Sequence, residues 1–218
     1  MIVTIDGPAG SGKSTAAHAL ADRLGFDFLD TGAMYRAVAL AFIRTRIDFK
    51  DLHAIEDLLT NLHVEVPRGK VVVNGEDVAS LIRTPEVSQA ASKVAVIPAV
   101  RWFLADEQGA AAVGRDMVCE GRDQGTFVFP HAECKFFLIA DPRIRAERRW
   151  REQVAKGLSI SVEDVLKAQE ERDARDASRD LAPMKPAADA VVLDTTHLTN
   201  EEVLAKLEEV TRACRART

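Results

Sequence analysis

Apolar residues in this chain form short runs separated by longer amphipathic stretches, a pattern that predicts strands alternating with helices. The apolar runs are typical of strands buried in a parallel sheet, and they predict strands at residues 2–5, 26–29, 117–120, 134–140 and 190–193. The amphipathic stretches predict helices at residues 13–24, 30–43, 51–62, 84–96, 98–113, 142–156, 161–178 and 199–213. This alternation indicates an α/β fold, with a parallel sheet flanked by helices.

One stretch interrupts the alternation. Residues 64–83 contain two valine-rich runs and an Asn74-Gly75 pair, which is a strong signal for a tight hairpin turn. We therefore expect a small β-rich insertion there. Helix-end signals support two of the predicted helices: Gly25 is a plausible C-terminal cap, and Thr199 with Glu202 has the spacing of a capping box.

Length and composition are those of an ordinary globular protein of one domain, with 218 residues, 47% hydrophobic and 29% charged. The net charge of −5 argues against a nucleic-acid partner, because nucleic-acid binders normally carry a basic excess. No uninterrupted apolar run approaches the ~18 residues of a membrane span. Three scattered cysteines without C-x-x-C spacing predict reduced thiols, so we expect a cytoplasmic protein that neither enters a membrane nor is exported.

Residues Gly7–Thr15 fit the phosphate-binding loop pattern of Gly, any four residues, Gly-Lys-Ser/Thr. Such a loop turns main-chain N–H groups toward an anion, and the following helix offers its N-terminus to the same phosphates. Lys13 can reach the β- and γ-phosphates, and the Ser14 hydroxyl is a candidate ligand of Mg²⁺. The expected ATP-binding residues are Gly7, Pro8, Ala9, Gly10, Ser11, Gly12, Lys13, Ser14 and Thr15.

Two further segments could hold a second phosphate-bearing molecule. In Thr31–Arg36, a hydroxyl and free N–H groups open a helix, but a capped helix with a solvated arginine explains the spacing equally well. The sequence Gly121-Arg122-Asp123 follows a predicted strand, at the end where open α/β sheets bind ligands. Arg122 can grip a phosphate with two donors, and Asp123 can accept from an exocyclic amino group.

Arginines are concentrated in two helical stretches. Five of them lie at positions 143, 145, 148, 149 and 151, which favours a lid that closes over reacting phosphates above a merely solvated face. Residues Arg172, Asp176 and Arg179 have the i, i+4, i+7 spacing of one helix face. Taken alone, that spacing is better explained by surface ion pairs.

Together these segments closely resemble the bacterial cytidylate kinases, which belong to the nucleoside monophosphate kinases. The resemblance covers nearly the whole chain. It rests on residues 5–15, 29–36, 82–87, 120–123, 128–130, 171–173 and 183–190.

This resemblance implies transfer of the ATP γ-phosphoryl group to CMP, and to dCMP, with Mg²⁺ as cofactor. It implies one P-loop kinase domain over residues 1–218 with a core at 1–35, 114–141 and 158–218. A monophosphate-binding region at about 36–113 contains the β-rich insertion, and the arginine lid is at about 142–157. We expect a monomer whose partners are these small molecules only.

The resemblance also assigns roles to residues that the spacing alone left open. It places Arg36, Arg122 and Arg179 at the CMP phosphate, and Ser92, Arg101 and Asp123 at the cytosine. Asp176, steadied by Arg172, would hold the ribose hydroxyls. Thr31 joins the substrate-binding set, and the candidate catalytic residues are Lys13, Arg148, Arg151 and Arg179.

Three positions depart from the family pattern: Gln124, His131 and Trp150. Gln124 is the neighbour of Asp123, so the departure bears on base selectivity more than on activity. The alternatives are another small-molecule P-loop kinase and, from a different class, a P-loop nucleotide switch. The switch is disfavoured because the sequence contains no Asn/Thr-Lys-x-Asp guanine-reading motif and because a switch has no obvious use for an arginine lid.

Overall fold

A computed structural model of the chain describes residues 1–67, 70–155 and 157–216. Residues 68–69 of the expected insertion, residue 156 of the expected lid and the last two residues lie outside the described part. Contacts divide the chain into two compact units, Met1–Phe28 with Arg115–Thr218 and Leu29–Gly114. The arginine-rich segment therefore belongs to the first unit. The predicted division into core, monophosphate-binding region and lid by role stays a prediction.

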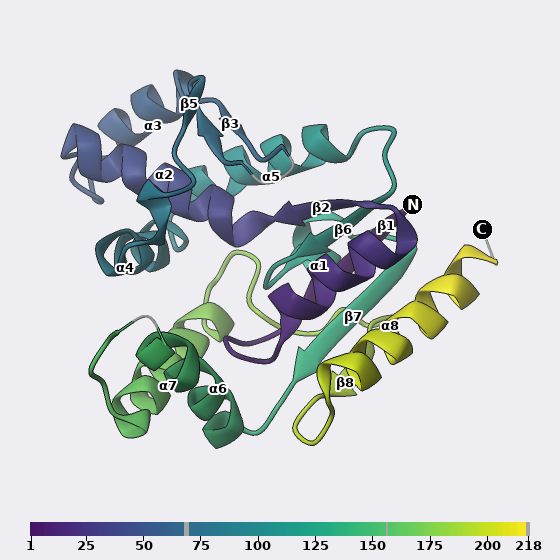
Figure 1. Ribbon diagram of the computed structural model, residues 1–218. Helices are drawn as coiled ribbons and strands as arrows, with labels where there is room; N and C mark the ends of the chain where they lie inside the picture. The colour runs from purple at the N-terminus through teal and green to yellow at the C-terminus, as the bar shows by residue number, and fades with distance from the viewer. Residues whose placement is uncertain (68–69, 156, 217–218) are drawn as a thin grey trace. The chain divides into compact units, whose positions relative to one another are not determined.

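The first unit is built on a five-stranded sheet in the order β2-β6-β1-β7-β8. Strand β1 pairs in parallel with β6 and with β7, and β7 pairs in parallel with β8 (Figure 1). Ligands of parallel sheets bind at the carboxyl ends of the strands. The end of the central strand β1 is therefore the expected place for a site. The strands are β1 Ile2–Asp6, β2 Asp27–Asp30, β6 Met117–Glu120, β7 Cys134–Ile139 and β8 Val191–Asp194.

Helices α1 (Lys13–Leu24) and α8 (Asn200–Arg215) pack on each other and on the sheet. Their apolar faces close a core with the central strands, in which Leu20, Phe136 and Leu207 are almost fully buried. Both predicted helix ends are confirmed. Gly25 caps α1 in the left-handed conformation (φ 69°), and Thr199 and Glu202 form a capping box at α8.

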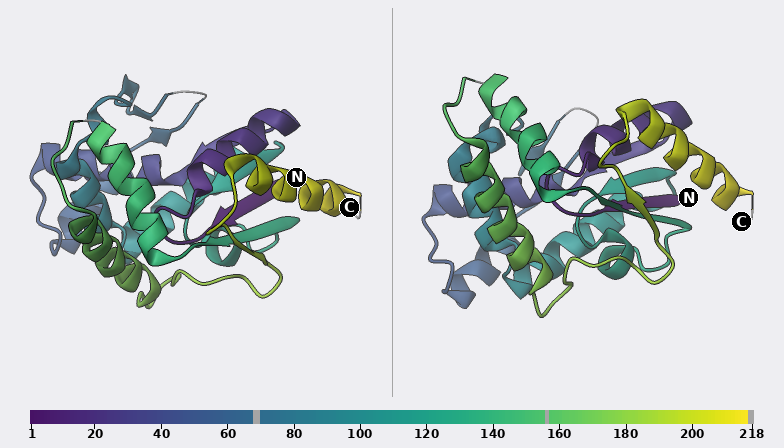
Figure 2. Two further views of the ribbon diagram at one scale, coloured as in Figure 1. Left: turned by 60° about the horizontal axis from the view of Figure 1, so that its bottom comes forward. Right: turned by 90° about the horizontal axis from the view of Figure 1, so that it is seen from below.

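Helices α6 (Pro142–Ala155) and α7 (Val162–Ala177) complete the first unit and lie side by side, as Figure 2 shows. The expectation that residues 161–178 form one helix bearing Arg179 on its face is wrong in one respect. The helix ends at Ala177, and Arg179 lies in the chain beyond it. The i, i+7 spacing therefore does not describe Arg179.

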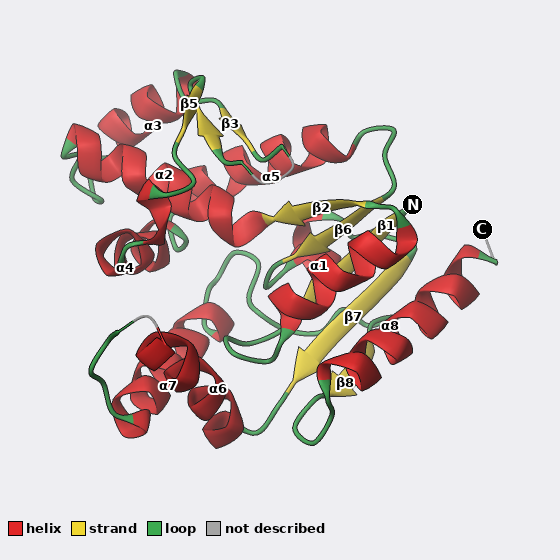
Figure 3. Ribbon diagram, viewed as in Figure 1, coloured by secondary structure: helices red, strands yellow, loops and turns green. Residues whose placement is uncertain are grey.

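The second unit contains helices α2, α3, α4 and α5 and a three-stranded antiparallel sheet (Figure 3). This sheet confirms the predicted β-rich insertion, although residues 81–83 form a turn of 3₁₀-helix rather than strand. The helices are α2 Thr31–Thr45, α3 Leu52–Thr60, α4 Pro85–Val94 and α5 Pro98–Ala112, and the strands are β3 Val64–Glu65, β4 Val72–Val73 and β5 Glu76–Asp77.

One element of the first unit was not expected. Residues Gln124–Val128 form a single turn of π-helix directly after Asp123. Cys119 and Cys134 are buried, and the Sγ atoms of Cys134 and Cys214 are 3.0 Å apart. Among the described residues, no helix combines the length and apolar character that a membrane span requires.

Candidate active site

The phosphate-binding loop begins where the central strand ends. Strand β1 stops at Asp6. Gly7 has a φ of 139°, a conformation that residues other than glycine rarely adopt. A Cβ atom at Gly7 would lie 2.1 Å from the main-chain oxygen of Leu138, so the close approach of β7 also requires glycine. Gly12 (φ 87°) turns the chain into α1, whose first residue is Lys13. The sequence thus sets the N-terminus of α1 beside the loop, as a phosphate site requires.

Lys13 is buried near both arginines and carboxylates. Its side chain is 4% exposed, and Nζ donates to the main-chain oxygen of Pro8 (2.7 Å) and lies 3.9 Å from Glu120. Burial first, and then the charge of Arg122, lower the pKa of Lys13 to about 7, against the attraction of Glu120. An anionic ligand at this lysine would stabilise its charged form, which fits a phosphate group.

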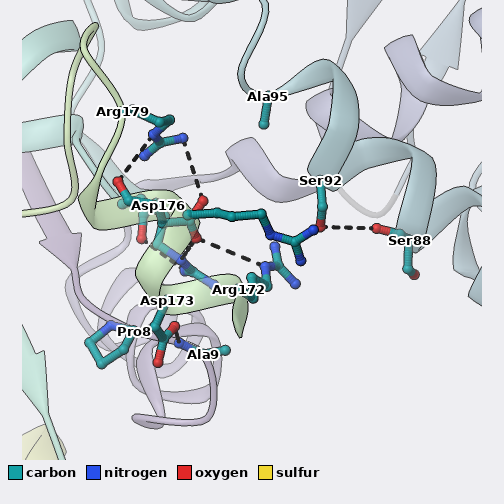
Figure 4. A network of polar contacts seen from close by, with 12 residues as sticks. Pro8, Ala9, Ser88, Ser92, Ala95, Arg172, Asp173, Asp176 and Arg179 are labelled. Carbon is teal, nitrogen blue, oxygen red and sulfur yellow. Dashed lines mark hydrogen bonds and ion pairs between the residues drawn. The ribbon is translucent and has the colours of Figure 1, made fainter. Parts of the chain in front are cut away.

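An ion pair from α6 and α7 holds the middle of the loop. Asp173 accepts from the Ala9 N–H (3.2 Å), and Figure 4 shows the two residues together. Arg145 donates to the Ala9 carbonyl (2.9 Å) and pairs with Asp173. Helix α7 therefore binds the N–H of Ala9, and α6 binds its carbonyl. The sequence placed Arg145 among the five arginines of the expected lid but gave Asp173 no role. The one available signal for Asp173 was its place in residues 171–173, which contribute to the family resemblance.

Three predicted site residues meet at the carboxylate of Asp176. Arg122 Nε donates to its Oδ2 at 3.3 Å, and Arg179 and Arg172 lie at 3.6 and 3.9 Å. Arg179 also donates through Nε to the main-chain oxygen of Asp176 (Figure 4), which brings it back to the site from beyond the helix. This cluster of three arginines around one aspartate is called the arginine cluster below. Its excess positive charge suits a second phosphate.

The remaining arginines of α6 differ from one another. Arg148 donates to the side chain and main-chain oxygens of Thr195, whose hydroxyl donates to the Ser11 carbonyl (3.0 Å). Arg151 is largely exposed and lies 3.7 Å from Glu147. Arg148 thus lies beside the phosphate loop and lines a cavity of about 160 Å³ with Ser11 and Thr15, whereas Arg151 does not line it.

In the second unit, α2 opens with a polar arrangement of its own. Asp30 caps the helix by accepting from the Ala33 N–H (2.8 Å) and pairs with Arg36 (3.2 Å). Thr31 is buried at the first helical position, and Gly32 is pressed between the side chains of Asp30 and Arg36. The alternative of a capped helix is therefore correct for the cap, but Arg36 is held by a carboxylate rather than solvated.

The two other residues assigned to cytosine lie on different helices of this unit. Ser92 on α4 is half-buried and donates to the Ser88 carbonyl (3.4 Å; Figure 4). Arg101 on α5 is 2% exposed, donates to the Ala95 carbonyl (3.2 Å) and lies over the ring of Tyr35. Burial of a whole arginine is unusual and marks Arg101 as more than a surface charge.

The described residues contain no group of three or more His, Cys, Asp or Glu side chains arranged to hold a metal ion. This fits Mg²⁺, which usually binds through one or two protein oxygens and the substrate's phosphates. Ser14 is exposed at the start of α1, where its hydroxyl can reach a phosphate-bound ion. The exposed Ser14 hydroxyl at the phosphate loop therefore fits a Mg²⁺ ion that is bound to the phosphates of ATP.

Comparisons with known proteins identify the family of the chain. The sequence model of the cytidylate kinase family matches residues 3–213. The cytidylate kinase of Carboxydothermus hydrogenoformans is 44% identical over 214 residues, covering 96% of each chain. That of Solibacter usitatus is 46% identical over 215 residues, covering 98% of this chain and 93% of the relative.

Solved structures with much lower identity share the fold. A gluconokinase from Sinorhizobium meliloti is 16% identical with a TM-score of 0.50, covering 98% of this chain and 93% of its own. A shikimate kinase from Bacteroides thetaiotaomicron is 13% identical with the same TM-score, covering 97% and 98%. These likenesses identify a P-loop kinase fold, and the family match goes further: the chain belongs to the cytidylate kinase family.

Proposed function

We propose that this protein transfers the γ-phosphoryl group of ATP to CMP, and to dCMP, giving ADP and the nucleoside diphosphate. The observation that carries the proposal is the positive charge gathered in the first unit, where Lys13 is buried in the phosphate loop and three arginines surround Asp176. Two sets of phosphates, one from each substrate, would neutralise that charge. Membership of the cytidylate kinase family supports CMP as the acceptor.

The donor half consists of the loop Gly7–Thr15 and the residues that hold it. Main-chain N–H groups of the loop and the N-terminus of α1 bind the phosphates of ATP. Lys13 supplies a charge whose present partner, the Pro8 carbonyl, is readily exchanged for a phosphate oxygen. The Ser14 hydroxyl would hold Mg²⁺, which when bound neutralises charge on the transferred phosphoryl group.

For the acceptor, the residues proposed are the arginine cluster in the first unit and a separate set in the second unit. Arg36, Arg122 and Arg179 bind the CMP phosphate, in exchange for the carboxylates with which they now pair. Asp123, Ser92 and Arg101 read the cytosine, Thr31 adds a hydroxyl, and Asp176 with Arg172 holds the ribose. Arg148, beside the phosphate loop, and the exposed Arg151 contribute charge to the donor side.

No general base is needed for this reaction. The attacking oxygen belongs to a phosphate whose second pKa is about 6, so it is already ionised at neutral pH. The protein's contribution is to position the two substrates and to stabilise the charge that spreads over the transferred group. Lys13 and Arg179 make that contribution from the two halves of the site. We infer that the enzyme acts as a monomer on free nucleotides in the cytoplasm.

Base selectivity provides the sharpest test. A carboxylate at position 123 accepts from the cytosine amino group and repels the carbonyl of uracil. Asp123→Asn adds a donor, so kcat/KM for CMP falls by about 10²-fold relative to UMP while KM for ATP is unchanged. Kinetics of ADP release with CMP, dCMP, UMP, AMP and GMP measure this, with the exposed Glu152→Gln as control. Equal turnover of CMP and UMP by the unaltered protein would refute the assignment.

A further inference from the structure

Asp6 is a buried carboxylate that joins the two halves of the site within the first unit. It is the last residue of β1, immediately before the phosphate loop, and is 3% exposed. Its Oδ1 accepts from the N–H of Gln124 (2.9 Å) and its Oδ2 from the N–H of Gly125 (2.8 Å). Both carboxylate oxygens are thus directed at the chain just after Asp123, not at the phosphate loop.

These bonds fix the main chain on one side of Asp123. On the other side, the Gly121 N–H donates to the Ile5 carbonyl (3.1 Å). Between them, Asp123 has an uncommon conformation (φ −151°, ψ 20°), and its carbonyl accepts from the Phe127 N–H (2.9 Å) in the π-helical turn. The direction of the Asp123 side chain therefore depends on where β1 holds residues 121 and 124–125.

The turn at Gly125 packs tightly against β1. A Cβ atom at Gly125 would lie 2.9 Å from Thr4 Oγ1, 3.3 Å from Lys135 Cδ and 3.5 Å from Asp6 Oδ2. Any larger residue would push the turn away from β1 and lengthen both hydrogen bonds to Asp6. Gln124 is 1% exposed, so the turn has no space in which to shift without disturbing the core.

The electrostatic surroundings of Asp6 fit a carboxylate whose role is to accept hydrogen bonds. Burial is the main cause that raises the pKa of Asp6 to about 7, with repulsion from Asp123 adding to it. The N–H groups of Gly125 and Gln124, and then Lys13, oppose the rise. Burying a carboxylate in such surroundings costs folding free energy. Carboxylates with a pKa perturbed in this way are typical of functional sites.

We propose that Asp6 is a positioning residue for base selection: it fixes the turn at 124–125 so that the Asp123 carboxylate is presented to the base of the acceptor. This inference rests on the proposed role of Asp123 in reading cytosine. It adds a specificity determinant that does not itself touch the substrate and that lies beside the donor loop. The role predicts an effect on the acceptor that is separate from any effect on ATP.

Asp6→Asn is the appropriate variant because it keeps the shape and replaces one acceptor oxygen with a donor amide. That amide faces an N–H group and cannot accept from it. At pH 8 we expect KM for CMP to rise by about tenfold or more and the CMP-to-UMP ratio of kcat/KM to fall by a similar factor. KM for ATP should change by less than about threefold. Asp116→Asn, a carboxylate paired with the N-terminus before β6, is the matched control.

A role confined to folding or to the phosphate loop gives a different result. Equal increases in KM for ATP and CMP, or an unchanged CMP-to-UMP ratio, would overturn the proposal. If Asp6→Asn does not fold, Gly125→Ala displaces the same turn from β1 by a change in the turn itself and must show the same selective effect. An equal effect on both substrates in Gly125→Ala would likewise overturn it.

Amide hydrogen exchange separates this inference from the proposed function. In Asp6→Asn, exchange should accelerate in residues 121–128 and stay unchanged in residues 9–15. That result supports the positioning role even if the unaltered protein fails to phosphorylate CMP, an outcome that would refute only the proposed function. Acceleration in both segments, or in neither, would contradict the role of Asp6.

Discussion

Proton uptake on ATP binding follows directly from the surroundings of Lys13. In the free protein, burial and nearby arginines lower the pKa of Lys13 to about 7, so at pH 8 roughly one-tenth of the molecules carry the ammonium form. A phosphate charge about 4 Å away stabilises that form by about 4 kcal/mol at an effective dielectric of 20, or about 3 pKa units. The bound lysine is therefore charged at pH 8, and binding takes up about 0.9 proton.

The sign of the pH dependence follows. Between pH 7 and about 10 the complex holds more protons than the free protein, so ATP affinity falls by up to about tenfold per pH unit as the pH rises. Calorimetric titration of ATP at pH 8, in two buffers with different ionisation enthalpies, measures the uptake. ATP itself is fully ionised at this pH and adds little.

A matched variant isolates the lysine. Lys13→Arg keeps a positive charge that does not titrate, so its uptake should be near zero while binding persists. Zero uptake in the unaltered protein, or equal uptake in Lys13→Arg, would refute the reasoning about Lys13.

Three further predictions concern the contacts around the loop and the arginine cluster. Gly10→Ala would bring a Cβ atom 2.8 Å from the Arg145 carbonyl at a φ of 76°, so KM for ATP should rise at least about tenfold in steady-state assays. Arg145→Ala leaves the carboxylate of Asp173 without its arginine partner and should lower the free energy of unfolding in urea by about 3–5 kcal/mol. The exposed Arg149→Ala should lower it by less than about 1 kcal/mol, and equal effects would contradict the burial argument. Asp176→Asn should reduce kcat/KM for CMP by about tenfold or more and spare ATP binding, whereas a larger loss of ATP binding would contradict its place in the acceptor half.

The elements that the sequence predicts well are those with local signals. Gly25 and the Thr199–Glu202 box mark helix ends because a cap depends on residues within one turn. The loop at Gly7–Thr15 is equally local, since its glycines and its following helix are adjacent in the chain. The small sheet of the insertion was recognisable from its turn at Asn74-Gly75.

Elements that depend on distant residues were not predictable in this way. Arg145 and Arg149 are alike in the sequence, but Arg145 is buried because Asp173, 28 residues away, meets it. Periodicity placed Arg179 on a helix that ends at Ala177, because no strong helix breaker marks that end. Asp6 holds a turn 118 residues further along, and no spacing rule connects the two.

The most direct test of the central claim is to follow the transferred phosphoryl group itself. With ATP labelled in the γ-phosphate, and with CMP and Mg²⁺, the account predicts label in the β-phosphate of CDP, one CDP for each ADP, and no accumulation of free phosphate. Label released as inorganic phosphate, with CMP unchanged, would contradict the claim that the loop Gly7–Thr15 and the arginine cluster are two halves of one phosphoryl-transfer site.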